Sequence, residues 1–99
     1  MMLTRGRFIS YEYDRMVVLF SMCDDQKEIP CAISTSAMDE LEGVVLVRAG
    51  HRETQFMRLR ERIEACADGK YQAKEFEGAP PGIILRSIDF RKQRQSPPV

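Results

Sequence analysis

The sequence predicts an α+β domain in which a small antiparallel sheet is packed by one long helix. Apolar segments near 16–22, 28–35 and 83–90 have the length and the β-branched or aromatic content of strands. From about 51 to 76, apolar residues recur at steps of three and four, which is typical of an amphipathic helix. Two strands followed by helices and a returning strand favour a helical layer on one face of a sheet.

The two ends of the chain are expected to lie outside this domain. We expect residues 1–10 to form a loose N-terminus, although Phe8–Tyr11 can also form a short strand or an extended lead-in. Residues 11–90 then make a single α+β domain. Residues 91–99 are basic, end in Pro-Pro-Val and are predicted to be a disordered tail.

Strand pairing follows from the connection between the first two apolar segments. The first segment is apolar on both alternating faces, which is typical of a central strand. The polar stretch Cys23–Lys27 predicts a hairpin to the next strand, where Ile29, Cys31 and Ile33 share one face. Pro30 cannot donate a ladder hydrogen bond, so this strand is an edge or Pro30 is its first unpaired position.

A shorter helix is predicted to start near residue 37. Ser36 and Asp39 have the spacing of a capping box, in which the Ser36 hydroxyl accepts from the backbone N–H of Asp39. The helix then begins at Ala37, and Gly43 either ends it or lies inside it. Val44–Val47 form its second half or a short strand, and we favour the helix because no hairpin signal surrounds them.

The long helix near 51–76 has the strongest periodic signal in the sequence. Its stripe at steps of three and four consists of Phe56, Leu59, Ile63, Cys66 and Lys70. Gly69 costs a helix about 1 kcal/mol relative to Ala, so it kinks the helix or ends its regular part. We expect the stripe to pack on the sheet, and the last strand to place Ile84, Ile88 and Phe90 on one face.

The order and spacing of these packing residues resemble a known family. The resemblance rests on Met16-Val17-Val18-Leu19-Phe20, Ile29-Pro30-Cys31-Ala32-Ile33-Ser34, Ala37-Met38, Phe56, Arg60-Glu61-Arg62-Ile63-Glu64, Ala67, Lys70-Tyr71, Ile83-Ile84-Leu85 and Asp89-Phe90. Over residues 11–90 the chain resembles the bacterial domain of unknown function 1488. The resemblance implies a compact α+β fold in the bacterial cytoplasm, and it implies no reaction, ligand or catalytic set. Met38 stands where the family usually has Leu, and Pro80-Pro81 replace a more polar turn.

Composition argues against several classes of function. The 99 residues carry 15 Lys and Arg against 15 Asp and Glu, and this zero net charge argues against general binding of polyanions. No apolar run approaches the roughly 20 residues of a membrane span, and the beginning of the chain lacks a secretory apolar core. Three cysteines without a C-x-x-C motif predict free thiols, and therefore a cytoplasmic location.

The sequence contains no motif for catalysis, a cofactor or a metal. A nucleophilic cysteine needs a nearby base, and His51 is the single histidine available to Cys23 or Cys31. A zinc site formed by these residues with Cys66 would need a local ligand pair, which their wide spacing does not offer. We therefore predict no catalytic residue, no metal and no cofactor, with an unrecognised Cys/His enzyme site as an alternative.

Charge is segregated along the chain although its sum is zero. Residues 24–42 are acidic, whereas 48–64 and 86–94 are basic, and these regions can pair within one chain or across a dimer. The basic residues that define a candidate interaction surface are Arg58, Arg60, Arg62, Arg91, Lys92 and Arg94. The same residues support the alternative of weak nucleic-acid binding, although the stretch lacks interleaved aromatic rings for base stacking.

Our leading prediction is a non-catalytic protein-interaction or regulatory module in the bacterial cytoplasm. It follows from the missing catalytic set and from the segregated charge. A homodimer is one form that the interaction can take, because a domain of this size has a thin stability margin and gains from extra burial. We predict no membrane association and identify no small-molecule ligand.

Overall fold

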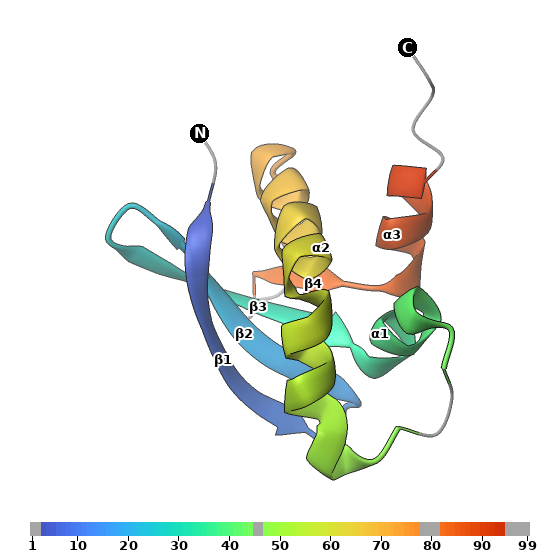
Figure 1. Ribbon diagram of the computed structural model, residues 1–99. Coiled ribbons are helices and arrows are strands. Elements are labelled where there is room, and N and C mark those ends of the chain that lie inside the picture. The colour runs from blue at the N-terminus through green and yellow to red at the C-terminus, as the bar shows by residue number, and fades with distance from the viewer. Residues whose placement is uncertain (1–2, 45–46, 78–81, 95–99) are drawn as a thin grey trace.

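The computed structural model describes residues 3–44, 47–77 and 82–94, the last three by their backbone alone (Figure 1). As predicted, the fold is α+β. The strands are β1 (Thr4–Glu12), β2 (Val17–Asp24), β3 (Lys27–Ser34) and β4 (Ile83–Leu85). The helices are α1 (Thr35–Glu42), α2 (Arg52–Gln72) and α3 (Ser87–Arg94), and the 3-10 turn η1 (Ala49–His51) precedes α2.

The strands form one sheet in the order β1-β2-β3-β4. β1, β2 and β3 are successively antiparallel, and the predicted hairpin is confirmed, with Asp25 at a φ of 59° in its turn. β4 pairs with β3 in parallel, so the sheet is mixed rather than purely antiparallel. A parallel pair needs a crossover connection, and α1 and α2 lie in the segment that provides it.

The long helix α2 packs across one face of the sheet and closes the core (Figure 1). The predicted stripe is confirmed, since Phe56, Leu59, Ile63 and Cys66 are buried there. The Phe56 ring centre lies 5.1 Å from that of Phe20 on β2. Among the described helices, none is both long enough and apolar enough to cross a bilayer.

The N-terminal segment is a strand in its described part, which corrects the expected loose terminus over 1–10 and confirms the alternative of a strand at Phe8–Tyr11. β1 pairs with β2, and the pairing is irregular between Arg5 and Phe8. At that irregularity Gly6 approaches Ser21 so closely that a Cβ would lie 2.3 Å from the Ser21 carbonyl oxygen. Phe8 then packs against the core, with its ring centre 5.7 Å from that of Phe56. The polar residues before Phe8 lack the apolar alternation by which a strand is predicted from sequence.

The C-terminal segment also differs from expectation, because the predicted strand over 83–90 ends at Leu85 and α3 follows. The Asp89 carboxylate accepts a 2.7 Å hydrogen bond from the backbone N–H of Arg86. This bond is the reciprocal half of a capping box and favours a helix start. Ile88 is consequently 53% exposed and does not share a core face with Phe90, which is buried.

The predicted disordered tail over 91–99 is helical as far as Arg94. Residues 95–99 lie outside the described part of the chain.

The structure decides several local predictions about helix caps, helix ends and a strand edge. Ser34, rather than Ser36, caps α1 by accepting a 3.1 Å hydrogen bond from the backbone N–H of Ala37. Gly43 ends α1 in the left-handed conformation, so Val44 is not helical, and the neighbouring residues 45–46 lie outside the described part.

The strand that contains Pro30 is not an edge in the described sheet, since β3 lies between β2 and β4. β4 pairs with β3 from Cys31 onward, so Pro30 directly precedes the parallel pairing. Gly69 lies inside α2, which continues to Gln72 rather than to residue 76.

Candidate functional site

The candidate arginine surface is divided between two helices in the described structure. α2 carries Arg58, Arg60 and Arg62, and α3 carries Arg91. The side chains of Lys92 and Arg94 lie outside the described part.

Two of these arginines hold carboxylates on α1. Arg58 lies 2.8 Å from Glu42, and Arg91 lies 2.8 Å from Glu40. The hydrogen bond from Arg58 lowers the pKa of Glu42 below its ordinary value. The acidic and basic regions therefore pair within one chain, which is one of the two arrangements that the sequence leaves open.

The other two candidate arginines of α2, Arg60 and Arg62, differ in their contacts. Arg60 forms a 2.8 Å ion pair with Glu64 and donates a 2.9 Å hydrogen bond to the Gly6 carbonyl oxygen. Arg62 is exposed and has no hydrogen bond or ion pair with another described residue. The face of α2 therefore offers little uncompensated positive charge for a phosphate backbone.

The cysteines do not assemble a reactive site with His51. Cys31 and Cys66 are buried, and burial raises the pKa of each thiol to about 12. Cys23 is half-buried on β2, whereas His51 is exposed in η1. Over residues 3–44, 47–77 and 82–91, no three His, Cys, Asp or Glu side chains are grouped to hold a metal ion. Thiols kept neutral by burial are poor nucleophiles, which favours a packing role for Cys31 and Cys66.

The sheet face opposite α2 is open in the described part of the molecule. α1 and α3 pack against each other beside the sheet rather than over it (Figure 1). Strand register places one row of side chains across this open face, formed by Ser10, Leu19, Ala32 and Ile84. The last three are aliphatic, so the centre of an uncovered sheet face is apolar.

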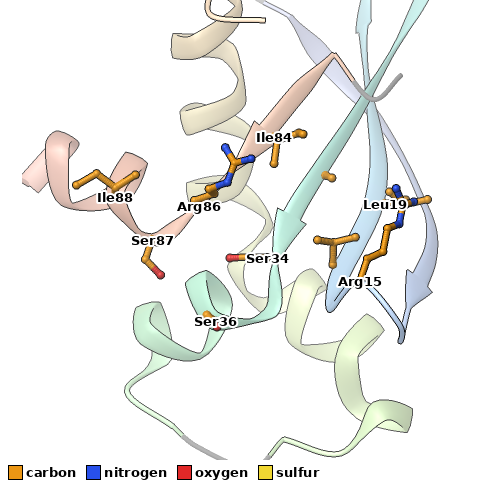
Figure 2. A pocket seen from close by; sticks show the side chains of 10 residues that line it. Arg15, Leu19, Ser34, Ser36, Ile84, Arg86, Ser87 and Ile88 are labelled. Carbon is orange, nitrogen blue, oxygen red and sulfur yellow. The ribbon is translucent and has the colours of Figure 1, made fainter. Parts of the chain in front are cut away.

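A groove of about 600 Å³ lies over this row, and we call it the open-face groove (Figure 2). Its apolar floor consists of Val17, Leu19, Ala32, Ile84 and Ile88. Its polar rim consists of Arg15, Ser34, Ser36, Arg86 and Ser87. These lining residues include no Asp, Glu, His or Cys, so the groove contains hydrogen-bond donors and aliphatic surface but no group for acid–base or nucleophilic chemistry.

The turn between β1 and β2 carries exposed apolar side chains, but they contact Tyr11 on the α2 side of the sheet rather than the groove. Tyr13 is 70% exposed and Met16 is 50% exposed, on either side of the groove residue Arg15. Met16 has a φ of 56°, and its sulfur accepts a 3.7 Å hydrogen bond from the Tyr11 hydroxyl.

The rim arginines retain unused donors. The closest carboxylate to Arg15 is that of Glu12, at 3.6 Å, which is too long for a hydrogen bond. Arg86 donates a 2.6 Å hydrogen bond to Glu77, and this bond lowers the pKa of Glu77. A guanidinium has five N–H donors, so both side chains can bind a further acceptor.

Sequence reasoning missed the groove, although one signal for it was present. The segment 16–22 is apolar on both alternating faces, and only one of those faces is covered by α2. The positions of the two rim arginines could not be predicted locally, because Arg15 and Arg86 come from opposite ends of the chain. Register between strands brings them to one groove.

Comparison with known proteins supports the fold and shows the family. A crystal structure of a protein of unknown function from the DUF1488 family of Shewanella loihica PV-4 is similar, with a TM-score of 0.69 at 15% sequence identity. The similarity covers 83% of this chain and 92% of that chain. No curated protein matches the sequence. The family described as "Protein of unknown function (DUF1488)" matches residues 5–84, and the chain therefore belongs to the DUF1488 family.

Proposed function

We propose that this protein is a non-catalytic interaction module that binds a protein partner through the open-face groove. The observation that carries the proposal is the aliphatic row Leu19, Ala32 and Ile84 on a sheet face that no described helix covers. A solvated face of a sheet is normally polar along its alternating positions. Ala32 is already only 2% exposed, so a partner that covers this row removes the exposed surface of the half-buried Leu19 and Ile84 from water. Such burial is the main favourable term in protein association.

The chemistry of the groove supports binding rather than catalysis. Its described lining has two guanidinium groups and serine hydroxyls, but no carboxylate, imidazole or thiol. A serine nucleophile needs an adjacent base, and the groove offers none. The Cys/His alternative is disfavoured because two of the three thiols are buried with raised pKa values.

Nucleic-acid binding is also disfavoured by the contacts of the arginines. Arg58, Arg60 and Arg91 each hold a carboxylate of the same chain, so phosphate binding would have to displace an existing partner. A cytoplasmic location belongs to the same proposal. It is supported by the three free cysteines, which suit a reducing compartment.

Site-specific photocrosslinking in the native host tests the proposal. Benzoylphenylalanine replaces Ile88, which is 53% exposed at the groove, and replaces the exposed Arg62 of α2 in a matched control. We expect discrete crosslinked products from position 88 and not from position 62, with the crosslinked segment identified by mass spectrometry. A product that contains a second copy of this chain identifies a homodimer. The absence of any product specific to position 88 contradicts the proposal.

A further inference from the structure

We infer that the segment bound in the open-face groove is acidic, with aliphatic side chains flanked by Asp or Glu. The inference rests on the proposed function, because it specifies the partner of the same groove. Arg15 and Arg86 are the charged residues of the described lining, and both are cationic. An occupant that covers them must therefore supply acceptors, or it leaves two guanidinium groups partly desolvated without partners.

The two arginines lie at the same level along the strands but on opposite sides of the floor. Arg15 precedes β2, whose first residue Val17 pairs with Ser34 at the end of β3. Arg86 follows β4, whose last residue Leu85 pairs with Ile33. The part of the aliphatic floor that lies on the sheet is thus between the two guanidinium groups, whereas Ile88 lies on α3 beyond Arg86 (Figure 2). A segment with carboxylates on both sides of an apolar centre matches this arrangement.

Both guanidinium groups are accessible to such carboxylates. The Arg15 side chain is 58% exposed and the Arg86 side chain is 50% exposed. The carboxylates that contact them, Glu12 and Glu77, are not among the groove residues and leave most of their N–H donors unused. A bidentate guanidinium–carboxylate pair is stronger than a neutral hydrogen bond and fixes orientation.

Serine hydroxyls add further hydrogen-bond donors where α1 and α3 begin at the rim of the groove. Ser36 and Ser87 lie in the first turns of α1 and α3 and line the rim. Neither hydroxyl has a hydrogen-bond partner within residues 3–44, 47–77 and 82–91. First turns of helices also favour negative charge, so this side of the groove is electrostatically suited to an anionic group.

Other occupants fit these features less well. A second copy of this chain would bring its own Arg15 and Arg86 to the groove. The carboxylates of that copy nearest its groove, Glu12 and Glu77, are already paired with those arginines. A nucleic acid supplies phosphates, but the floor is aliphatic and has no aromatic ring on which bases could stack. An acidic, aliphatic protein segment satisfies both the floor and the rim.

Fluorescence anisotropy with paired synthetic peptides tests the inference. The two probes are amphipathic peptides of about four helical turns that share their Leu and Ile positions and differ in carrying Glu or Lys at the polar positions. We expect the Glu peptide to bind about tenfold or more tightly than the Lys peptide, and its affinity to fall with added salt. The double variant R15Q/R86Q is expected to bind the Glu peptide about tenfold more weakly than the wild type.

The control is Arg62→Gln, which removes an exposed arginine of α2 outside the groove. We expect it to leave the affinity for the Glu peptide unchanged, and circular dichroism checks that every variant is folded. A loss of about threefold or more in R62Q, against about tenfold in R15Q/R86Q, overturns the inference, because binding then follows the number of positive charges removed. Equal affinity for the Glu and Lys peptides overturns it too, while leaving the groove as an apolar docking site.

The photocrosslinked segment provides an independent readout. A captured segment that carries Asp or Glu beside aliphatic residues supports the inference even where neither synthetic peptide binds. A captured segment without carboxylates, or a second copy of this chain, overturns it while the proposed function stands. If position 88 yields no specific product and neither peptide binds, both the inference and the proposed function fail.

Discussion

Arg52 on α2 donates a 2.6 Å hydrogen bond to the carboxylate of Asp39 on α1. The Arg52 side chain is 5% exposed and that of Asp39 is 22% exposed. Gln55 donates to the same carboxylate at 2.9 Å and accepts from Arg52 at 2.7 Å. The Arg52 guanidinium also lies 5.9 Å from the centre of the Tyr11 ring. One buried cation therefore joins α1, α2 and β1.

Removal of this cation is expected to destabilise the fold strongly. Arg52→Ala leaves the Asp39 carboxylate partly buried without its ion-pair partner, and we expect a loss of about 3 kcal/mol in the free energy of unfolding. Urea unfolding followed by circular dichroism measures the loss. The matched control is Arg58→Ala, which breaks the exposed pair with Glu42 and should cost much less. Equal losses in the two variants would contradict a special role for the buried pair.

Stability should fall in acid partly because of Asp39. Burial alone would raise the pKa of Asp39, but hydrogen bonds from Arg52 and Gln55 outweigh it and hold the pKa below the ordinary 3.8. The unfolded chain then binds this proton more readily, so the stabilisation is present above the unfolded pKa and is lost as the pH falls through the folded pKa.

The variant Asp39→Asn tests this linkage. We expect it to be less stable than the wild type at neutral pH and to lose less stability between about pH 5 and pH 2. Urea midpoints measured across that range provide the comparison. Other carboxyls with lowered pKa values, such as Glu42, remain in both proteins, so the difference between the curves isolates Asp39. Parallel curves would show that Asp39 does not contribute.

The close approach of Gly6 to Ser21 predicts that one added methyl group at position 6 lowers the stability of the fold. Gly6→Ala places a Cβ 2.3 Å from the Ser21 carbonyl oxygen, so the backbone of β1 or β2 must shift. We expect a loss of about 1–3 kcal/mol in the free energy of unfolding. Gly50→Ala is the control, because no atom lies within 4 Å of a Cβ at that position. A Gly6→Ala protein as stable as the control would contradict the observed packing of β1.

The parts of the fold that could be predicted are those determined by neighbouring residues. The hairpin between β2 and β3 follows from a polar turn between apolar segments, and α2 follows from its periodic stripe. The sequence indicates β1 only at Phe8–Tyr11. The start of β1 pairs irregularly where Gly6 meets Ser21 of another strand, so the polar residues 4–7 do not by themselves indicate a strand. The start of α3 depends on the bond between Asp89 and Arg86, which overrides the apolar pattern of the segment.

The groove could be predicted only in part for a related reason. The double-sided apolar character of residues 16–22 is local and indicates that the second sheet face is apolar. Whether a helix covers that face is set by chain topology, which places α2 on the other side. The pairing of Arg91 with Glu40, across 51 residues, likewise could not be distinguished from pairing across a dimer.

The burial of the α2 stripe predicts a large effect for core truncation. Ile63 is completely buried, and Ile63→Ala leaves a cavity between α2 and the sheet. We expect a loss of about 3 kcal/mol in the free energy of unfolding. Met57 on the same helix is 41% exposed, so Met57→Ala should change stability by roughly 0.5 kcal/mol or less. Similar effects of the two substitutions would contradict the assigned orientation of α2.

The cysteines are expected to differ in their reactivity toward alkylating reagents. Burial raises the pKa of Cys31 and Cys66 from 9.0 to about 12, which lowers their thiolate fraction about a thousandfold at neutral pH. The half-buried Cys23 should therefore react first with iodoacetamide in the native protein, and mass spectrometry of peptides identifies the labelled site. In urea all three thiols should react at similar rates, which controls for differences between the peptides. Native labelling of Cys66 as fast as that of Cys23 would show that the α2 stripe is accessible, and a reactive-thiol function would then have to be reconsidered.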